Sequence, residues 1–113
     1  MKSVETDMGA AKTFLKSTSS YLTTSVIIHN YYKYIIECSQ TLEKYIENNL
    51  QGKGKGLHEK VTSIEDELSE KDIKNFRFIA TARNQMVHEG KMTCEPREIE
   101  KVFQQLELKY NLN

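Results

Sequence analysis

The sequence predicts an all-α protein: a single domain, residues 1–113, folded as an antiparallel bundle of four or five helices. Helix breakers are scarce, because Pro96 is the only proline and three of the five glycines belong to the run GKGKG at 52–56. Apolar residues recur at the three- and four-residue steps of a helix along most of the chain. A chain of 113 residues can bury a core without disulfides or a structural metal.

Two helices are expected in the first half of the chain. The first covers residues 4–16, with Ser3 as its N-cap. The second covers residues 21–50, where no turn residue interrupts the chain. Its apolar residues form two adjacent rows: Tyr21, Ile28, Ile35 and Leu42, and then Tyr31, Cys38 and Tyr45. The segment VIIHNYYKYII within it is rich in residues that favour strands, but it has no turn at which a hairpin could reverse.

The second half predicts a loop and three more helical segments. After the loop QGKGKG, a short helix carries Leu57, Val61, Ile64 and Leu68. The next helix has Ser69 as N-cap, Asp72 three residues later, and Leu68 and Ile73 as a hydrophobic staple. It ends at Gly90, which suits a C-terminal stop. Pro96 starts the last helix, whose apolar stripe is Ile99, Val102, Phe103, Leu106 and Tyr110.

Composition indicates a soluble globular protein. Charged residues make up 28% of the chain and hydrophobic residues 38%, and the net charge is zero. Bulk charge therefore does not favour nucleic acid, and any such contact needs a local patch. Cys38 and Cys94 belong to no paired motif, which favours free thiols and argues against a zinc site. The N-terminal residues show no signal peptide, and no apolar run is long enough to span a bilayer, so a cytoplasmic protein without a membrane partner is expected.

Arg83 raises the main question of the sequence. On a helical wheel, six apolar residues fall within about 80° of it: Ile73, Phe76, Ile79, Ala80, Met86 and Val87. A buried guanidinium without a partner is costly. Arg83 therefore needs an internal carboxylate, such as Glu37 or Glu43, or else a second subunit or an anionic ligand.

Polar residues line one flank of the same helix. They are Arg77, Thr81, Asn84 and His88. His88 also suits the last turn of a helix through the macrodipole, without any functional role. Two other histidines, His29 and His58, have no evident partners, and we assign them no role.

The segment ARNQMVHEG, residues 82–90, resembles the R-N-x-x-x-H form of the R-x4–6-H motif of the HEPN superfamily. Arg83 matches the arginine of the motif, Asn84 the polar residue that often follows it, and His88 the histidine. The resemblance implies a small helical bundle with the motif late in the chain. In one branch of that superfamily a tyrosine stands two residues after the histidine, where this chain has Gly90, so control by modification of that tyrosine is not expected.

By resemblance, the chain is expected to be a metal-independent endoribonuclease without a cofactor. Its catalytic residues would be Arg83 and His88, supported by Asn84, in a composite site at a homodimer interface. Such proteins often act in toxin–antitoxin, phage-defence or CRISPR-associated systems, so an antitoxin or partner protein is expected too. Other members of the superfamily bind nucleotides or proteins without catalysis, and that alternative stays open.

The chemistry suits these residue types. RNA carries its own nucleophile, the ribose 2′-hydroxyl. Histidine can move its proton near neutral pH, and the guanidinium fork of arginine suits a phosphate with developing charge.

Contacts with RNA outside the motif are expected from Arg77, Lys53 and Lys55, with Lys60 extending the patch. For the GKGKG loop itself, a flexible and solvated conformation is the more favoured interpretation. Tyrosines that could stack on bases, namely Tyr31, Tyr32 and Tyr34, are better explained as core or dimer interface.

Overall fold

A computed structural model describes residues 24–112 of the protein. Its elements are α2 (Thr24–Asn49), α3 (Leu57–Ser63), the 3-10 turn η1 (Glu65–Glu67), α4 (Glu70–Glu89) and α5 (Pro96–Tyr110). No strand occurs among these residues, and the prediction of an all-α bundle is confirmed. The helix expected at residues 4–16, with its Ser3 cap, lies outside the described residues.

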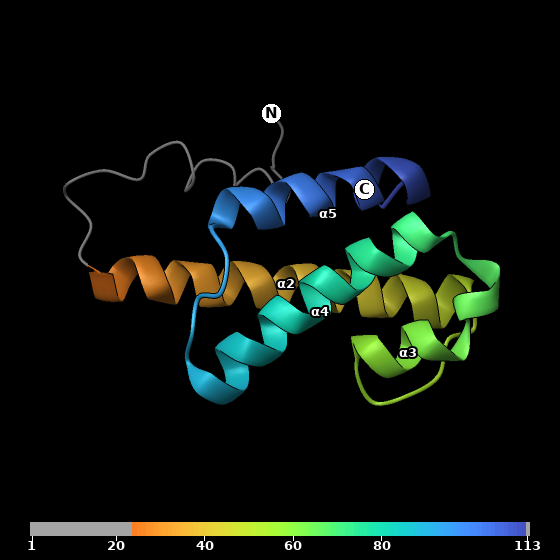
Figure 1. Ribbon diagram of the computed structural model, residues 1–113, viewed down its shortest axis with the longest axis horizontal. Coiled ribbons are helices and arrows are strands. Elements are labelled where there is room, and N and C mark those ends of the chain that lie inside the picture. The colour runs from red at the N-terminus through yellow and green to blue at the C-terminus, as the bar shows by residue number, and fades with distance from the viewer. Residues whose placement is uncertain (1–23, 113) are drawn as a thin grey trace.

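Helix α4 is the central element of the described bundle. It contacts α2, α3 and α5. It crosses α2 in the opposite direction, whereas α5 returns in the direction of α2 (Figure 1). A residue on the packing face of α4 can therefore meet several other helices.

Helix α2 supplies the largest share of the core. Its inward residues follow helical spacing: Tyr31, Tyr34, Ile35, Cys38, Leu42 and Ile46 are all buried. Helix propensities of ordinary residues differ by at most about 0.7 kcal/mol, whereas burying one large apolar side chain contributes about 1.5–3 kcal/mol. Burial on one helical face therefore outweighs the strand preference of VIIHNYYKYII. Ile28 lies on the same face but stays 37% exposed, because the described helices do not cover this end of α2.

Local signals fix both ends of α4 as predicted. The Ser69 hydroxyl accepts a hydrogen bond from the Asp72 backbone N–H at 3.1 Å. Gly90 takes the left-handed conformation, with a φ of 66°, and its N–H bonds the Met86 carbonyl. Helix α5 likewise begins with Pro96 in its first turn, inside a capping box formed by Glu95 and Glu98.

The short helix between α2 and α4 ends earlier than predicted. The short helix stops at Ser63, after which the chain makes the 3-10 turn η1 and reaches Leu68 in an extended conformation. This extended residue gives α4 its own start at the Ser69 cap.

A buried carboxylate joins the first turn of α4 to the last turn of α5. Asp72 accepts hydrogen bonds from the Tyr110 hydroxyl and from the Lys109 ammonium at 2.6 Å. Burial by itself raises the pKa of Asp72, but these bonds outweigh it and leave the pKa below its usual value. The contact holds the end of α5 against α4, where the Tyr110 ring also packs on Phe76 and Tyr45.

Candidate functional site

Arg83 lies in the middle of the packing face of α4, but it is only half-buried. Its neighbours on that face, Phe76, Ile79 and Met86, are buried. Its Nη1 donates a hydrogen bond to Oδ1 of Asn84 at 3.1 Å. Within residues 24–112 it forms no ion pair. The internal carboxylate partner that the sequence left open is therefore absent from this part of the chain.

A pocket of about 180 Å³ lies beside Arg83, between α2, α3 and α4. Its lining consists of Ser39, Glu43, Lys55, Gly56, Leu57, His58, Glu59, Ala80, Arg83 and Asn84. Glu43 accepts a hydrogen bond from the Ser39 hydroxyl at 3.1 Å and makes no ion pair with Arg83. The pocket thus brings two cations and two carboxylates together without pairing Arg83 to either carboxylate.

Backbone and side-chain bonds hold the GKGKG loop that forms one wall of this pocket. The N–H of buried Gly52 bonds the Ile46 carbonyl at 3.0 Å, and the N–H of Lys53 bonds the Ser63 hydroxyl at 2.9 Å. The Lys60 ammonium donates to the Gly54 carbonyl at 2.7 Å and is buried. The expectation that Lys60 extends a surface patch is therefore wrong, because Lys60 is buried beneath the loop, whereas Lys53 and Lys55 themselves are exposed.

His58, to which we assigned no role from the sequence, is a central contact of the site. Its Nδ1 lies 3.2 Å from Nη1 of Arg77, and its Nε2 lies 3.3 Å from the Thr81 hydroxyl. Arginine only donates, so Nδ1 accepts and Nε2 carries the proton of a neutral ring. Burial first, and the charge of Arg77 second, lower the pKa of His58. Sequence periodicity could not reveal this contact, because it joins residues on separate helices.

Arg77 is occupied by the contact between α3 and α4. Besides His58, its guanidinium donates to the Thr62 hydroxyl at 2.9 Å and pairs with Glu65 at 3.4 Å. These bonds compete with the predicted contact of Arg77 with RNA. Lys53 is exposed but does not line the pocket, whereas Lys55 does.

His88 lies apart from the pocket. It is exposed in the last turn of α4 and is not among the lining residues. Five residues of helix separate it from Arg83 by about 140° of rotation and about 7.5 Å along the axis. Arg83 and Asn84 therefore share a pocket within one subunit, and His88 does not join them there.

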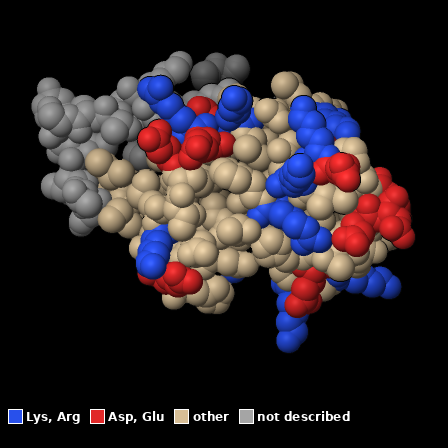
Figure 2. All heavy atoms as spheres, in the orientation of Figure 1, with Lys and Arg blue, Asp and Glu red and all other residues tan. Residues whose placement is uncertain are grey.

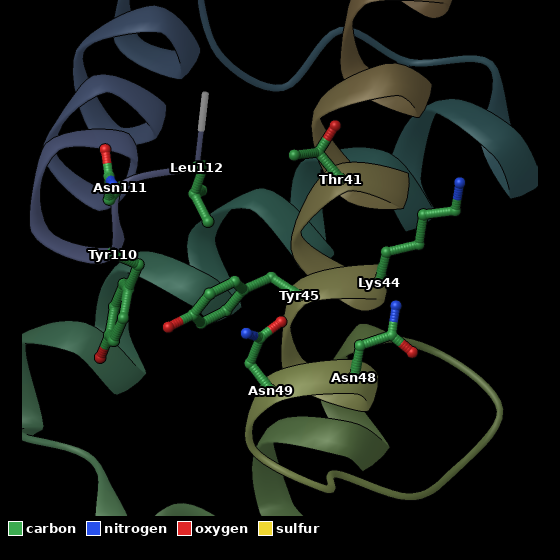
Figure 3. A pocket seen from close by; sticks show the side chains of 8 residues that line it. All are labelled: Thr41, Lys44, Tyr45, Asn48, Asn49, Tyr110, Asn111 and Leu112. Atoms are coloured by element: carbon green, nitrogen blue, oxygen red, sulfur yellow. The ribbon is translucent and has the colours of Figure 1, made fainter.

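A second, wider groove lies between the C-terminal half of α2 and the end of α5. It has a volume of about 540 Å³ and is lined by Thr41, Lys44, Tyr45, Asn48, Asn49, Tyr110, Asn111 and Leu112 (Figure 3). The rings of Tyr45 and Tyr110 lie 5.3 Å apart, and the Tyr110 hydroxyl is already bound to Asp72. Of the tyrosines expected in the core or an interface, Tyr31 and Tyr34 are buried, and Tyr32 is 42% exposed.

The described surface shows no large field of one charge on the face in view. Basic and acidic side chains are interspersed around η1 and the start of α4, while an uncharged area covers the N-terminal half of α2 beside α4 (Figure 2). Among residues 24–112, no group of three or more His, Cys, Asp or Glu could hold a metal ion. Cys38 and Cys94 are free thiols. Over the same part of the chain, the helices are too short or too polar to cross a membrane.

Comparison with models of known protein families, with curated proteins and with solved structures gives no match in any of the three.

The first prediction concerns the stability of the Arg83 site. Because Arg83 forms no ion pair within the described part of the chain, Arg83→Ala should change the free energy of unfolding by less than about 1 kcal/mol, whereas breaking a buried pair costs about 3–5 kcal/mol. Urea denaturation measures the difference. Asp72→Ala serves as the contrasting variant, because it leaves the Tyr110 hydroxyl without its acceptor and should cost about 1–3 kcal/mol. A larger loss for Arg83→Ala than for Asp72→Ala would contradict this interpretation.

The second prediction concerns the pH dependence that His58 confers. Its folded pKa is below that of the unfolded chain, near 6.5. As pH falls through about 6.5, the unfolded state takes up a proton that the folded state refuses, so the folded state loses stability. His58→Gln, which can still accept from Arg77, should lose less stability than the wild type between pH 7.5 and pH 5. The exposed His88→Gln variant is the matched control and should follow the wild type; equal slopes for His58→Gln and the wild type would refute the role of His58.

Proposed function

We propose that this protein is a metal-independent endoribonuclease of the HEPN type. The observation that carries the proposal is the state of Arg83: a half-buried guanidinium on a packing face, with no ion pair within the described residues and an adjacent pocket. A protein that used Arg83 only for packing would have little reason to keep such a charge unpaired. The resemblance of residues 82–90 to the superfamily motif gives this arginine a chemical task.

The proposed chemistry divides the work among three residues of α4. His88 takes the proton of the ribose 2′-hydroxyl as that oxygen attacks the neighbouring phosphorus. Arg83 binds the phosphate and stabilises the charge that develops on it. Asn84, whose Oδ1 accepts from Arg83, orients the guanidinium. The bond between phosphorus and the 5′-oxygen then breaks, the leaving oxygen takes a proton from solvent water, and the product carries a 2′,3′-cyclic phosphate.

A second copy of the chain completes the proposed site. His88 and Arg83 of one subunit point apart, so a single subunit does not bring them to one phosphate. Three exposed large hydrophobic residues, Ile28, Tyr32 and Met92, belong to the start of α2 and the segment after α4. These segments lie at the same end of the bundle as the last turn of α4 (Figure 1). Docking two copies through that end would cover apolar surface and bring His88 of one copy toward Arg83 of the other.

The alternative function is non-catalytic binding of a nucleotide or of a protein partner. It is favoured by the pocket itself, which holds Arg83 and Asn84 with Lys55 and two carboxylates but excludes His88. Under either function, the biological setting that the motif suggests is toxin–antitoxin or phage defence.

The third prediction concerns assembly. If the site is shared, the protein should be a dimer at micromolar concentration, because a monomer would leave Arg83 and His88 apart. Multi-angle light scattering measures the mass directly. Tyr32→Glu should shift the protein toward monomer and reduce cleavage together, while Leu108→Glu, at an exposed site on α5, should change neither. A wild-type monomer that still cleaves RNA would contradict the shared site.

The fourth prediction concerns the chemical step. Purified protein should cleave mixed RNA in EDTA, and His88→Ala should slow the cleavage by roughly 10²–10⁴-fold. RNA affinity should change little in that variant, because affinity depends mainly on phosphate contacts from Lys and Arg. Gel analysis and mass spectrometry of the products should show 2′,3′-cyclic phosphate or its hydrolysed form. Cleavage of RNA methylated at the 2′-oxygen, or full activity of His88→Ala, would show that the mechanism is different.

A further inference from the structure

We infer that the pocket between α2, α3 and α4 binds the sugar-phosphate unit of one nucleotide, with Lys55 and Arg83 on the phosphate and Glu43 on a ribose hydroxyl. Its assignment to a nucleotide of an RNA chain rests on the function proposed above. The binding of the unit itself rests on the lining residues.

Two cations of this pocket, Arg83 and Lys55, have hydrogen-bond donors that are not used within the described residues. Arg83 uses one N–H on Asn84, and a guanidinium has five. Lys55 uses its backbone N–H on Glu59, and its ammonium forms no ion pair within residues 24–112. A phosphate can accept from both, through the charge-assisted bonds that arginine and lysine make with phosphate oxygens.

Two carboxylates of the same pocket restrict the ligand further. Glu43 receives one hydroxyl proton from Ser39 at Oε2, and Glu59 receives the Lys55 N–H at Oε1. The second oxygen of each carboxylate is not used in these two hydrogen bonds, and such an oxygen accepts hydroxyl or amino donors but repels a phosphate. A ligand that satisfies both halves of the pocket carries an anion and neutral donors a short distance apart. A ribose phosphate has both, whereas inorganic phosphate has only the anion.

The size of the pocket indicates part of a larger ligand. Its volume of about 180 Å³ is below the range of about 300–1,000 Å³ typical of sites that enclose a whole drug-sized molecule. The rest of a bound chain must therefore continue outside. Asn84 is on the pocket wall, and His88 lies four residues later on the same flank of α4, about 6 Å along the helix. A nucleotide held in the pocket would place the following phosphate near that flank.

The surface of α2 on the other side of the pocket disfavours a path for the rest of a bound RNA chain. The outer face of α2 carries a shallow depression whose lining includes the carboxylates Glu43 and Glu47, with Lys44 as the cation among its lining residues. Phosphates passing there would meet mainly like charge. The chain is thus directed along α4 toward His88 rather than over α2.

His58 serves the pocket as a positioning residue. Its ring lines the wall while both nitrogens are used, by Arg77 and by Thr81. Neither nitrogen is free to move a proton, and the ring instead keeps α3, and with it Lys55, at a fixed distance from Arg83.

The test uses ligands that the protein cannot cleave. Binding of ribonucleoside 3′-monophosphates, their 2′-deoxy counterparts, inorganic phosphate and free glutamate is measured by NMR titration of the full chain. Ribonucleotides should bind tightest, and Lys55→Gln should weaken them by about tenfold, the loss expected for one charge-assisted bond. Lys53→Gln is the matched control, on the same loop but outside the lining, and should leave mononucleotide affinity unchanged.

Glu43→Gln tests the ribose half of the pocket. It should reduce the preference for ribonucleotides over deoxynucleotides, while folding is checked by the thermal midpoint of each variant. Equal effects of Lys55→Gln and Lys53→Gln, binding of inorganic phosphate as tight as that of nucleotides, or preference for glutamate would overturn the inference. These outcomes are separable from failure of the proposed nuclease. Binding with the predicted variant pattern but without RNA cleavage would contradict the nuclease and support the nucleotide pocket. RNA cleavage without that pattern would contradict the pocket and support the nuclease.

Discussion

The guanidinium of Arg83, which has no ion pair among residues 24–112, is the constraint around which the centre of this bundle is arranged. Helix α4 contacts every other described helix, so each residue of its packing face must meet a neighbour. At Phe76, Ile79 and Met86 that neighbour is apolar and the gap is filled. At Arg83 the charge would cost several kcal/mol if fully buried without a partner, and the structure avoids this cost by leaving a pocket and a half-exposed side chain. The packing on both sides of Arg83 thus leaves a pocket beside it. A continuous apolar stripe on α4 would have packed against the neighbouring helices without one.

The residues that keep this pocket in shape are not among those proposed to act in catalysis. Lys60 fixes the loop through the Gly54 carbonyl, and His58 joins α3 to α4 through Arg77 and Thr81. Each places a polar or charged group in a buried or half-buried position, where its desolvation costs more free energy than it would on the surface. Both contacts define the position of the 55–59 segment relative to Arg83. A site that must hold a small polar group needs that precision, because hydrogen bonds weaken steeply with distance and angle.

The sequence predicted the parts of this arrangement that depend on near neighbours. Ser69 and Gly90 fixed the ends of α4 through contacts only three or four residues away, and the helical spacing of α2 placed Ile35 and Leu42 in the core. The wheel likewise placed Arg83 on the packing face. It could not show that Glu43 would remain unpaired with Arg83, nor that His58 would reach Arg77 nineteen residues later, because both depend on the distance between separate helices. The exposure of Ile28 could not be predicted for the same reason. Periodicity assigns Ile28 to the inward face of its helix, but it does not show whether another helix covers that position.

The separation of His88 from the pocket bears directly on which function the site can perform. A five-residue step on a helix turns the two side chains away from each other, so the motif spacing by itself does not build a site. It builds one only if another surface supplies the missing group, and a two-fold axis near the last turn of α4 would do so for both subunits at once. In that arrangement the pocket beside Arg83 would lie at the edge of the shared site and hold the substrate, while His88 acts outside it. Without the axis, the same residues form a polar pocket with a balanced charge, which would suit a nucleotide but contains no histidine nitrogen free to move a proton, because both nitrogens of His58 are already used. The docking of a second subunit, and its position, would therefore decide between catalysis and binding.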